Sequence, residues 1–357
     1  MLYKPDWEEA QQRIIAWWEG EMIDRVCLQV TAPLVEPWDA ERPSIPEPAD
    51  LYERWANVDY VMESTADHIR RTFWGGEAFP LFFPNLGPDA FAAFFGGGLR
   101  FVDPWTSWVP PLITGWKRAP ELKIREDNPW WQLQLRLLRE AKARSDGQWI
   151  TGIPDTHSGG DALAALRGRN ELCLDLYDHP QEVKAAMERM VEAVLHAYEV
   201  YYEIVEPERY GSSSGWLPAC WWPGRANVVQ CDVIALISSE MVEEFLLESI
   251  IAEARWLDRA IFHLDGPDAV RHLDLLLAIP EIQAIQWVPG AGALPMTRWI
   301  PLLKRIQAAG KSLHLSVWPH EIRTLLEELK PEGLMLSTHV SSEAEARDLL
   351  ERVAKWT

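Results

Sequence analysis

The sequence predicts a single (β/α)8 barrel of the TIM type that spans residues 1–357. Short apolar runs typical of strands alternate eight times with longer helical segments along the chain. The connections in the second half are short, as parallel βα units require. No GxGxxG phosphate-binding loop follows the first expected strand, which disfavours an open doubly wound sheet, the main alternative.

Each expected strand is a short apolar run bounded by turn-forming residues. The eight strands are expected at 25–31, 79–84, 148–153, 208–214, 260–265, 282–288, 311–317 and 333–338. Helices are expected between them, at 51–72, 130–143, 161–177, 180–204, 238–258, 267–278, 296–309, 319–329 and 342–355. A further helix at about 6–20 precedes the first strand, because acidic residues open it and Gly20 ends it.

Three long loops, at 32–50, 96–120 and 215–232, elaborate the barrel, and the last two are rich in tryptophan. Loops of this length in a compact domain are usually lids or binding loops. The chain contains 20 tryptophans. That number exceeds what a core usually needs, so we expect some of them to line a cleft, the alternative being a tryptophan-rich core.

Composition excludes several classes of partner. The net charge of −20 argues against nucleic acid and against an anionic membrane surface. Four cysteines without CxxC spacing indicate neither a disulfide framework nor a zinc ribbon. No apolar stretch of transmembrane length and no signal peptide is evident, so we expect a cytoplasmic protein that acts on a small molecule. The composition is compatible with a homodimer.

The stretch Ala260–Pro267 ends an apolar strand with His263 and Asp265. Residues two apart in a strand share a face, so both side chains should project together at the carboxyl end, where barrels carry their chemistry. The expected catalytic residues are His263, Asp265, Asp155, His157 and Asp232. The expected substrate-binding residues are Trp216, Gln286, Trp287, Trp318, Asn85, Arg167 and Arg225.

Three chemistries are compatible with these residues. His263 and Asp265, with His314 or His339, could bind zinc with one open position; the alternative is a His–Asp hydrogen bond that orders the strand end. Paired aspartates could cleave glycosides beside stacking tryptophans, although Asp161 also suits a helix N-cap. Arg167 or Arg225 could bind an anionic group.

Three segments, Gln230–Met241, Phe262–Gly266 and Ile285–Gly290, resemble the uroporphyrinogen decarboxylase superfamily, which includes cobalamin-dependent methyltransferases. The resemblance covers nearly the whole chain. It implies a barrel enzyme that moves a methyl group from a small methoxylated or methylamine-type substrate to a corrinoid carried on a partner protein. It also implies a metal site, with zinc as the expected ion.

Two departures from that family bear on the chemistry. Zinc-bearing relatives carry His-x-Cys where this chain has His263 and Asp265, and no cysteine follows Cys231. We therefore do not expect a thiolate-rich zinc site. We expect either a metal bound by nitrogen and oxygen atoms or no metal. Arg25 is the only arginine near the first strand, so a porphyrinogen substrate is not expected. The alternatives are a carbohydrate-active hydrolase or lyase, a cofactor-free decarboxylase, or a barrel without catalytic activity.

Overall fold

The structure is a computed structural model that describes residues 1–36, 38, 45–217, 220–290 and 295–357. Its central element is a seven-stranded sheet in the order β2-β1-β11-β10-β9-β8-β7. All neighbouring strands are parallel except β2, which runs antiparallel to β1. The strands are β1 (Cys27–Pro33), β2 (Thr72–Gly76), β7 (Ala226–Gln230), β8 (Arg259–Asp265), β9 (Ala284–Val288), β10 (Ser312–Ser316) and β11 (Leu334–His339).

Two short sheets accompany the large one. Strands β3 (Leu81–Phe82) and β6 (Ile150–Thr151) pair in parallel, and a bridge joins Ile153 to Ser214. Strands β4 (Arg100–Phe101) and β5 (Ser107–Trp108) form an antiparallel pair. Among the described residues, no ladder joins β7 or β2 to the β3–β6 pair, so strand pairing establishes a parallel α/β fold and does not confirm a closed barrel.

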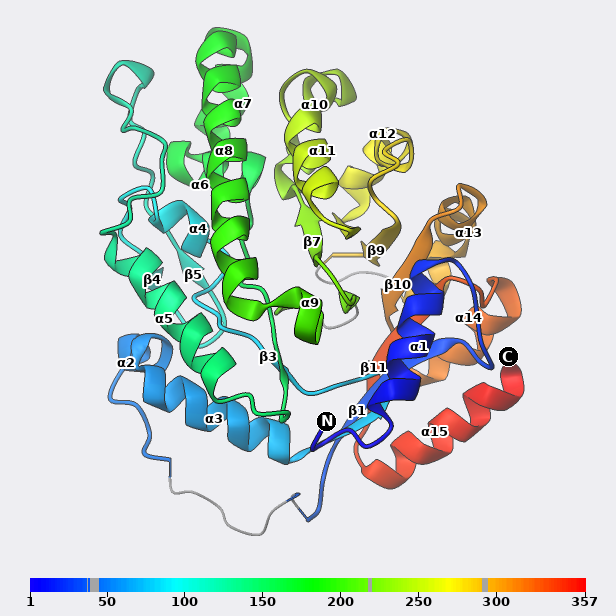
Figure 1. Ribbon diagram of the computed structural model, residues 1–357. Coiled ribbons are helices and arrows are strands. Elements are labelled where there is room, and N and C mark those ends of the chain that lie inside the picture. The colour runs from blue at the N-terminus through cyan, green and yellow to red at the C-terminus, as the bar shows by residue number, and fades with distance from the viewer. Residues whose placement is uncertain (37, 39–44, 218–219, 291–294) are drawn as a thin grey trace.

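Helices surround the strands, as Figure 1 shows. Most of them form an outer layer, whereas α1 lies across β10 and β11. Within the described residues, no helix is long and apolar enough to cross a membrane. The helices are α1 (Trp7–Trp18), α2 (Leu51–Ala56), α3 (Val58–Arg70), α4 (Ala90–Ala93), α5 (Pro129–Ala143), α6 (Gly159–Arg167), α7 (Arg169–Asp178), α8 (Pro180–Val205), α9 (Pro207–Tyr210), α10 (Ser239–Phe245), α11 (Leu247–Trp256), α12 (Leu273–Leu277), α13 (Ile300–Ala308), α14 (Ile322–Glu328) and α15 (Glu343–Trp356).

Most expected elements are confirmed, with two corrections among the strands. The strand expected at 208–214 is present only in part: Pro207 starts the helical turn α9, which ends at Tyr210, because its fixed φ suits the first helical position. Ser212 and Ser214 then form isolated β-bridges to Trp222 and Ile153. Strand β7 falls inside the loop expected at 215–232, where Val228 and Val229 favour extended backbone. Residues 218–219 of that loop, and residues 37 and 39–44 of the loop at 32–50, lie outside the described residues.

Three of the expected helices are each divided in two, and the one at 238–258 breaks at Leu246. The helix at 51–72 breaks at Asn57, whose side chain accepts the backbone N–H of Tyr60 and caps α3. The helix at 161–177 breaks at Gly168, which adopts a φ of +97° that other residues rarely reach. The expected helix at about 6–20 is present as α1.

Alternation along the strands determines where polar groups collect. Near the amino ends, one face of the sheet carries small and apolar residues that pack with the tryptophans of α1; they are Cys27, Val228, Ile261, Ala284 and Met335. Hydrogen bonds hold α1 there, because Trp17 donates its indole N–H to the carbonyl of Leu313 over 3.0 Å and accepts the Ser312 hydroxyl over 2.7 Å. Two residues further along each strand, the same face turns polar.

Candidate functional site

The polar layer is a row of side chains across neighbouring parallel strands. His263 of β8 lies opposite Gln230 of β7 and Gln286 of β9, and Gln286 lies opposite His314 of β10. Because these residues are register partners, their side chains share one face of the sheet. His263 Nδ1 lies 2.6 Å from Gln286 Oε1, and His314 Nε2 lies 2.7 Å from the hydroxyl of Ser337 on β11.

At one end of this row, three side chains come close enough to share a metal ion. The ligand atoms of Asp232, His263 and Asp265 all lie within 4.8 Å of one another. Asp265 Oδ1 is buried and has no hydrogen-bond partner among the described residues. Gln286 Oε1 accepts the Nδ1–H of His263, which leaves the Nε2 lone pair of that imidazole for another partner. One nitrogen and two carboxylates match a zinc site with an open position.

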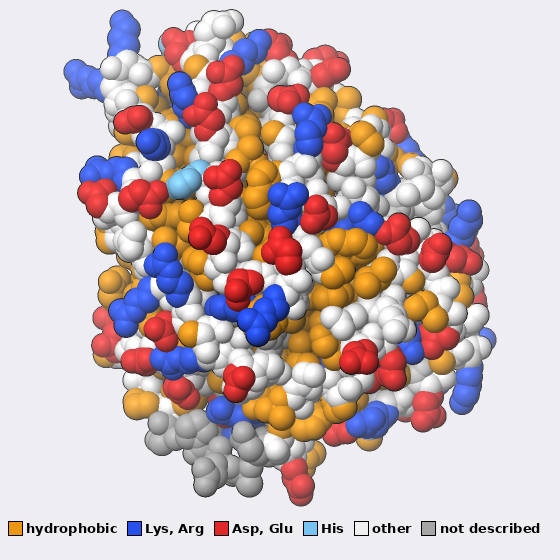
Figure 2. Space-filling model, in the orientation of Figure 1, with side chains coloured by type: hydrophobic (Ala, Val, Ile, Leu, Met, Phe, Trp, Pro, Cys, Tyr) orange, Lys and Arg blue, Asp and Glu red, His pale blue; other side chains and the backbone are white. Residues whose placement is uncertain are grey.

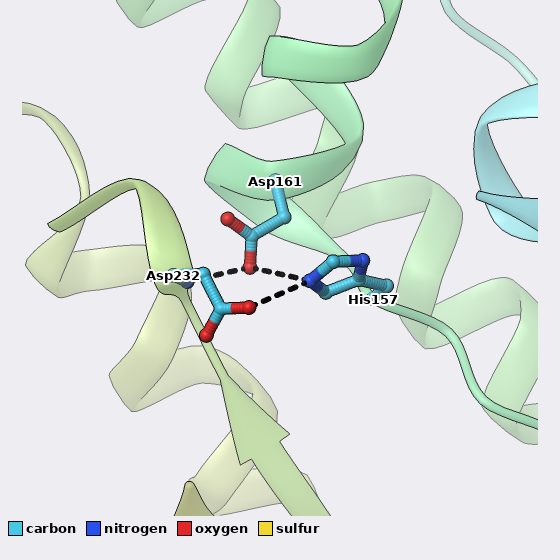
Figure 3. Close-up of side chains that lie close together, drawn as sticks. All are labelled: His157, Asp161 and Asp232. Atoms are coloured by element: carbon cyan, nitrogen blue, oxygen red, sulfur yellow. Dashed lines mark hydrogen bonds and ion pairs between the residues drawn. The ribbon is translucent and has the colours of Figure 1, made fainter. Parts of the chain in front are cut away.

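Asp232 also belongs to a second cluster, drawn in Figure 3. His157 Nε2 lies 3.3 Å from Asp161 and 3.4 Å from Asp232, and both carboxylates point at that single nitrogen. Asp161 accepts the backbone N–H groups of Asp232 and Val233, each over 2.8 Å. It therefore joins the start of α6 to the segment after β7, and it does not act as the N-cap of its own helix.

The segment that carries His157 is held in an unusual conformation. His157 has a φ of +30°, which is uncommon for a residue with a Cβ. Asp155 Oδ1 stabilises the turn, because it accepts the backbone N–H of His157 over 3.0 Å and the side-chain N–H of Gln230 over 2.8 Å. Backbone strain of this kind collects at functional sites.

Charge in this cluster is distributed by burial and by hydrogen bonds. Burial acts to lower the pKa of His157, but the carboxylates of Asp161, Asp232 and Asp155 outweigh it and raise that pKa to about 10. Burial opposes the charge of Asp232, yet the hydrogen bond and positive charge of His157 lower the pKa of this carboxyl below its usual range. A protonated imidazole cannot bind a metal, so His157 serves as the cationic partner of Asp232.

A cavity of about 250 Å³ lies along the other part of the row. Its wall includes Trp74, Phe79, Trp216, Gln286, His314 and Ser337. The Trp216 ring stands edge-on to the His263 imidazole, with 5.0 Å between their centroids. Trp216 and Gln286 therefore contact both the cavity and His263. The cavity combines aromatic surface with a few polar groups, as small-molecule sites do.

The structure brings together most of the predicted site residues and separates others. Trp287 is wrong as a pocket residue: it follows Gln286 directly, so it points to the helix side of the sheet and packs on Trp299. Arg225 precedes β7 and so lies at the opposite end of that strand, where it pairs with Asp258. It therefore cannot bind an anion at the mouth.

Of four other predicted residues, three have local partners and one is exposed. The side chain of Arg167 pairs with Asp175 over 2.6 Å. Asn85 accepts the backbone N–H of Gly87 and so shapes its own turn. His339 lies 3.0 Å from the Thr31 hydroxyl and is outside both acidic clusters. Trp318 is 68% exposed and is not part of the cavity wall.

The predicted site residues do not include Gln29 and Gln230, and the sequence left Asp161 either as one of the paired aspartates or as a helix N-cap. Ser337 donates its hydroxyl to Gln29 Oε1 over 2.8 Å, which extends the polar row to β1. A signal was present, because a single glutamine at the same depth in two apolar strands breaks their hydrophobic pattern. The role of Asp161 depends on contacts with residues 71 and 72 positions away, which no local pattern shows.

Comparison with known proteins supports the fold. No protein-family model matches the sequence, and no curated protein matches it significantly. Among solved structures, a methyltransferase from Methanosarcina mazei is similar, with a TM-score of 0.61 and 12% sequence identity. The similarity covers 97% of this chain and 98% of that one. At this identity the likeness concerns the fold alone, from one end of the chain to the other.

Proposed function

We propose that this protein is a methyltransferase that moves a methyl group from a small methoxylated or methylamine-type substrate to a corrinoid held by a partner protein. The observation that carries the proposal is the Asp232, His263 and Asp265 group at the carboxyl ends of β7 and β8. Its Asp265 Oδ1 is buried and has no partner among the residues described. The whole-chain likeness in fold to a methyltransferase supports the same reaction class. In this proposal the chain is one (β/α)8 barrel domain that acts in the cytoplasm.

The donor atoms present fit a zinc ion. Asp265 Oδ1 has no hydrogen-bond partner within the part of the chain that the structure describes. Gln286 fixes the His263 imidazole with Nε2 as an acceptor, which is how outer residues orient zinc-binding histidines. Asp232, His263 and Asp265 would hold the ion. A zinc ion there would act as a Lewis acid toward the heteroatom that carries the methyl group.

The chain's own residues would position the substrate and exclude water, and the proton of the reaction would come from the solvent. The bond between the methyl carbon and its oxygen or nitrogen breaks, the methyl group leaves as a cation equivalent, and Co(I) of the corrinoid supplies the electron pair of the new bond. The released heteroatom keeps the old bond's electrons and takes up one proton. Trp216, beside His263, would exclude water from the reacting group.

The structure does not favour glycoside cleavage by paired aspartates. That reaction needs two carboxyl groups on opposite sides of a bound sugar, about 5–10 Å apart. Asp161 instead accepts two backbone N–H groups and lies with Asp232 on a single histidine nitrogen. Asp161 therefore has a structural role.

A spectroscopic assay tests the proposal. The protein, loaded with zinc, is mixed with a corrinoid protein reduced to Co(I) and with methoxylated aromatics or methylamines, and methylcobalamin is followed by its absorption. We expect methylcobalamin with at least one donor, and none with His263→Ala. His196→Ala is the control, because His196 lies on α8 and pairs with Glu126. Absence of methylcobalamin with every donor would refute the proposal.

A further inference from the structure

The cavity along the polar row has a wall without formal charge. Of the described residues that form this wall, none is an aspartate, a glutamate, a lysine or an arginine. Three are the aromatic residues Trp74, Phe79 and Trp216, and the polar ones are serine, threonine, glutamine and a histidine, His314. The charge of a bound molecule would therefore meet no opposite charge in the described part of the wall.

The histidine of the wall does not change this conclusion. His314 is 1% exposed, and burial, reinforced by the nearby His263, lowers its pKa to about 3. The imidazole is therefore neutral at physiological pH. It offers no positive charge to a carboxylate or a phosphate group.

The charged groups near the wall are already engaged or lie outside it. Glu77 directly precedes the wall residue Ala78, but its side chain is fully buried and pairs with Arg25 over 2.8 Å. Asp232 and Asp265, the carboxylates of the group around His263, are not part of the described wall. Neither pair provides a counter-charge within the cavity.

Hydrogen bonds within the protein occupy several polar groups of the wall. Ser337 donates its hydroxyl to Gln29 Oε1 over 2.8 Å, and Thr338 donates its hydroxyl to the carbonyl of Val317 over 2.7 Å. The remaining surface of the cavity is mainly apolar. A bound molecule therefore meets carbon atoms over most of its own surface.

Size and desolvation together indicate which molecules fit. A cavity of about 150 Å³ lined by apolar side chains holds benzene, and this cavity measures about 250 Å³, so a substituted ring fits. An ion that enters loses its hydration without gaining a counter-ion. Aromatic faces attract cations, but such contacts recover only part of what an ion loses on leaving water.

We propose that the cavity selects uncharged ligands and binds a methoxylated aromatic ring without ionic groups, in preference to aromatic carboxylates and to ammonium compounds. This inference rests on the proposed function, for which it chooses between the two substrate classes. Methylamines carry a positive charge at neutral pH and are disfavoured. Methoxylated rings that carry a carboxylate are disfavoured as well.

Three probes of nearly equal shape test this inference without catalysis. At neutral pH, 4-methoxybenzamide is uncharged, 4-methoxybenzoate is an anion and 4-methoxybenzamidine is a cation. Calorimetric titration of the wild-type protein in EDTA, which keeps metal from binding the carboxylate, should show tighter binding of the amide by about tenfold or more. Equal or tighter binding of either ion, or binding of none of the three probes, would overturn the inference.

A charge added to the wall tests whether the ring binds in this cavity. Ser316 forms part of the wall at the exposed end of β10, so Ser316→Lys adds a cation there. It should strengthen binding of 4-methoxybenzoate about three- to fivefold. Thr324→Lys, at an exposed position of α14, adds the same charge outside the wall and should bind as the wild-type protein does. No gain in Ser316→Lys, or an equal gain in Thr324→Lys, would overturn the inference.

The inference and the proposed function fail in different ways. Tight and selective binding of the amide without methyl transfer from any donor would refute the proposed function alone. Methyl transfer to the corrinoid from 4-methoxybenzoate or 4-methoxybenzamidine as efficient as from 4-methoxybenzamide would refute this inference alone.

Discussion

His263 donates its Nδ1–H to the amide oxygen of Gln286, one strand away, over 2.6 Å. This hydrogen bond orients the imidazole and leaves Nε2 directed at other partners. It depends on the register of two parallel strands, in which His263 and Gln286 lie opposite each other. The sheet therefore supplies the orienting group as well as the ligand.

Removing this orienting group should weaken metal binding. We expect Gln286→Ala to lower zinc affinity about 10- to 100-fold, because residues that fix a metal-binding histidine typically contribute that much. The measurement is competition with a chromophoric chelator. His263→Ala and Asp265→Asn should abolish stoichiometric binding. His339→Ala should bind as the wild-type protein does, because His339 bonds with Thr31 instead; a loss in His339→Ala equal to that in His263→Ala would place the metal elsewhere.

Burial raises the pKa of Glu253 on α11 to about 7, although hydrogen bonds from Ser158 and Tyr198 oppose the rise. The folded protein thus keeps a proton between pH 4.5 and pH 7 that the unfolded chain loses. The contribution of the protonated Glu253 carboxyl group to the unfolding free energy is complete below pH 4.5 and is lost as pH rises through 7.

Replacing this carboxyl group should therefore change how stability depends on pH. Relative to the wild-type protein, Glu253→Gln should gain about 3 kcal/mol in unfolding free energy between pH 4.5 and pH 8. Urea unfolding at several pH values measures the difference. Glu248→Gln, at an exposed position of the same helix, is the control and should show no such trend. Parallel pH profiles for Glu253→Gln and the wild-type protein would show that Glu253 does not titrate near pH 7.

Arg25 and Glu77 form a buried ion pair with two hydrogen bonds of 2.8 Å, and Glu77 also accepts the backbone N–H of Leu28. The side chain of Glu77 is fully buried. We expect Glu77→Ala to cost about 3–5 kcal/mol in unfolding free energy, because it removes the carboxylate partner of the largely buried Arg25 guanidinium. Arg189→Ala, which breaks an exposed pair with Glu192, should leave the urea midpoint unchanged. Equal effects would contradict a structural role for the buried pair.

The burial of Trp287 predicts that its replacement affects stability and not ligand binding. Trp287 is fully buried on the helix side of the sheet, whereas Trp318 is 68% exposed. Trp287→Ala should therefore destabilise the protein by about 3–5 kcal/mol through a core cavity. Trp318→Ala should change unfolding free energy by less than about 0.5 kcal/mol. If Trp287→Ala is as stable as the wild-type protein but loses ligand affinity, this tryptophan lines the pocket after all.

The sequence predicted the second half of the fold well, because apolar alternation there is regular. The same alternation placed His263 and Asp265 on one face at the end of a strand, as observed. It should also have separated Gln286 from Trp287, since adjacent strand residues point in opposite directions. Assigning both to the pocket ignored that rule.

The parts of the site that escaped prediction depend on distant contacts. His157 and Asp232 are 75 positions apart, and their approach requires both the turn after β6 and the end of β7. Strand β7 itself was not predicted, because the tryptophan, proline and glycine residues around it are typical of a loop. Surface charge was easier to anticipate: acidic and basic side chains are interspersed on the face in Figure 2, in keeping with the acidic composition.

Following a labelled methyl group tests the central claim most directly. The zinc-loaded protein and a Co(I) corrinoid protein are incubated with 2-methoxyphenol that carries a ¹³C-methyl group, and the label is traced by NMR. We predict a cobalt-bound ¹³C-methyl signal with the wild-type protein and no such signal with His263→Ala. A label that stays on the methoxyphenol, or that reaches cobalt equally well with His263→Ala, would contradict methyl transfer at this site.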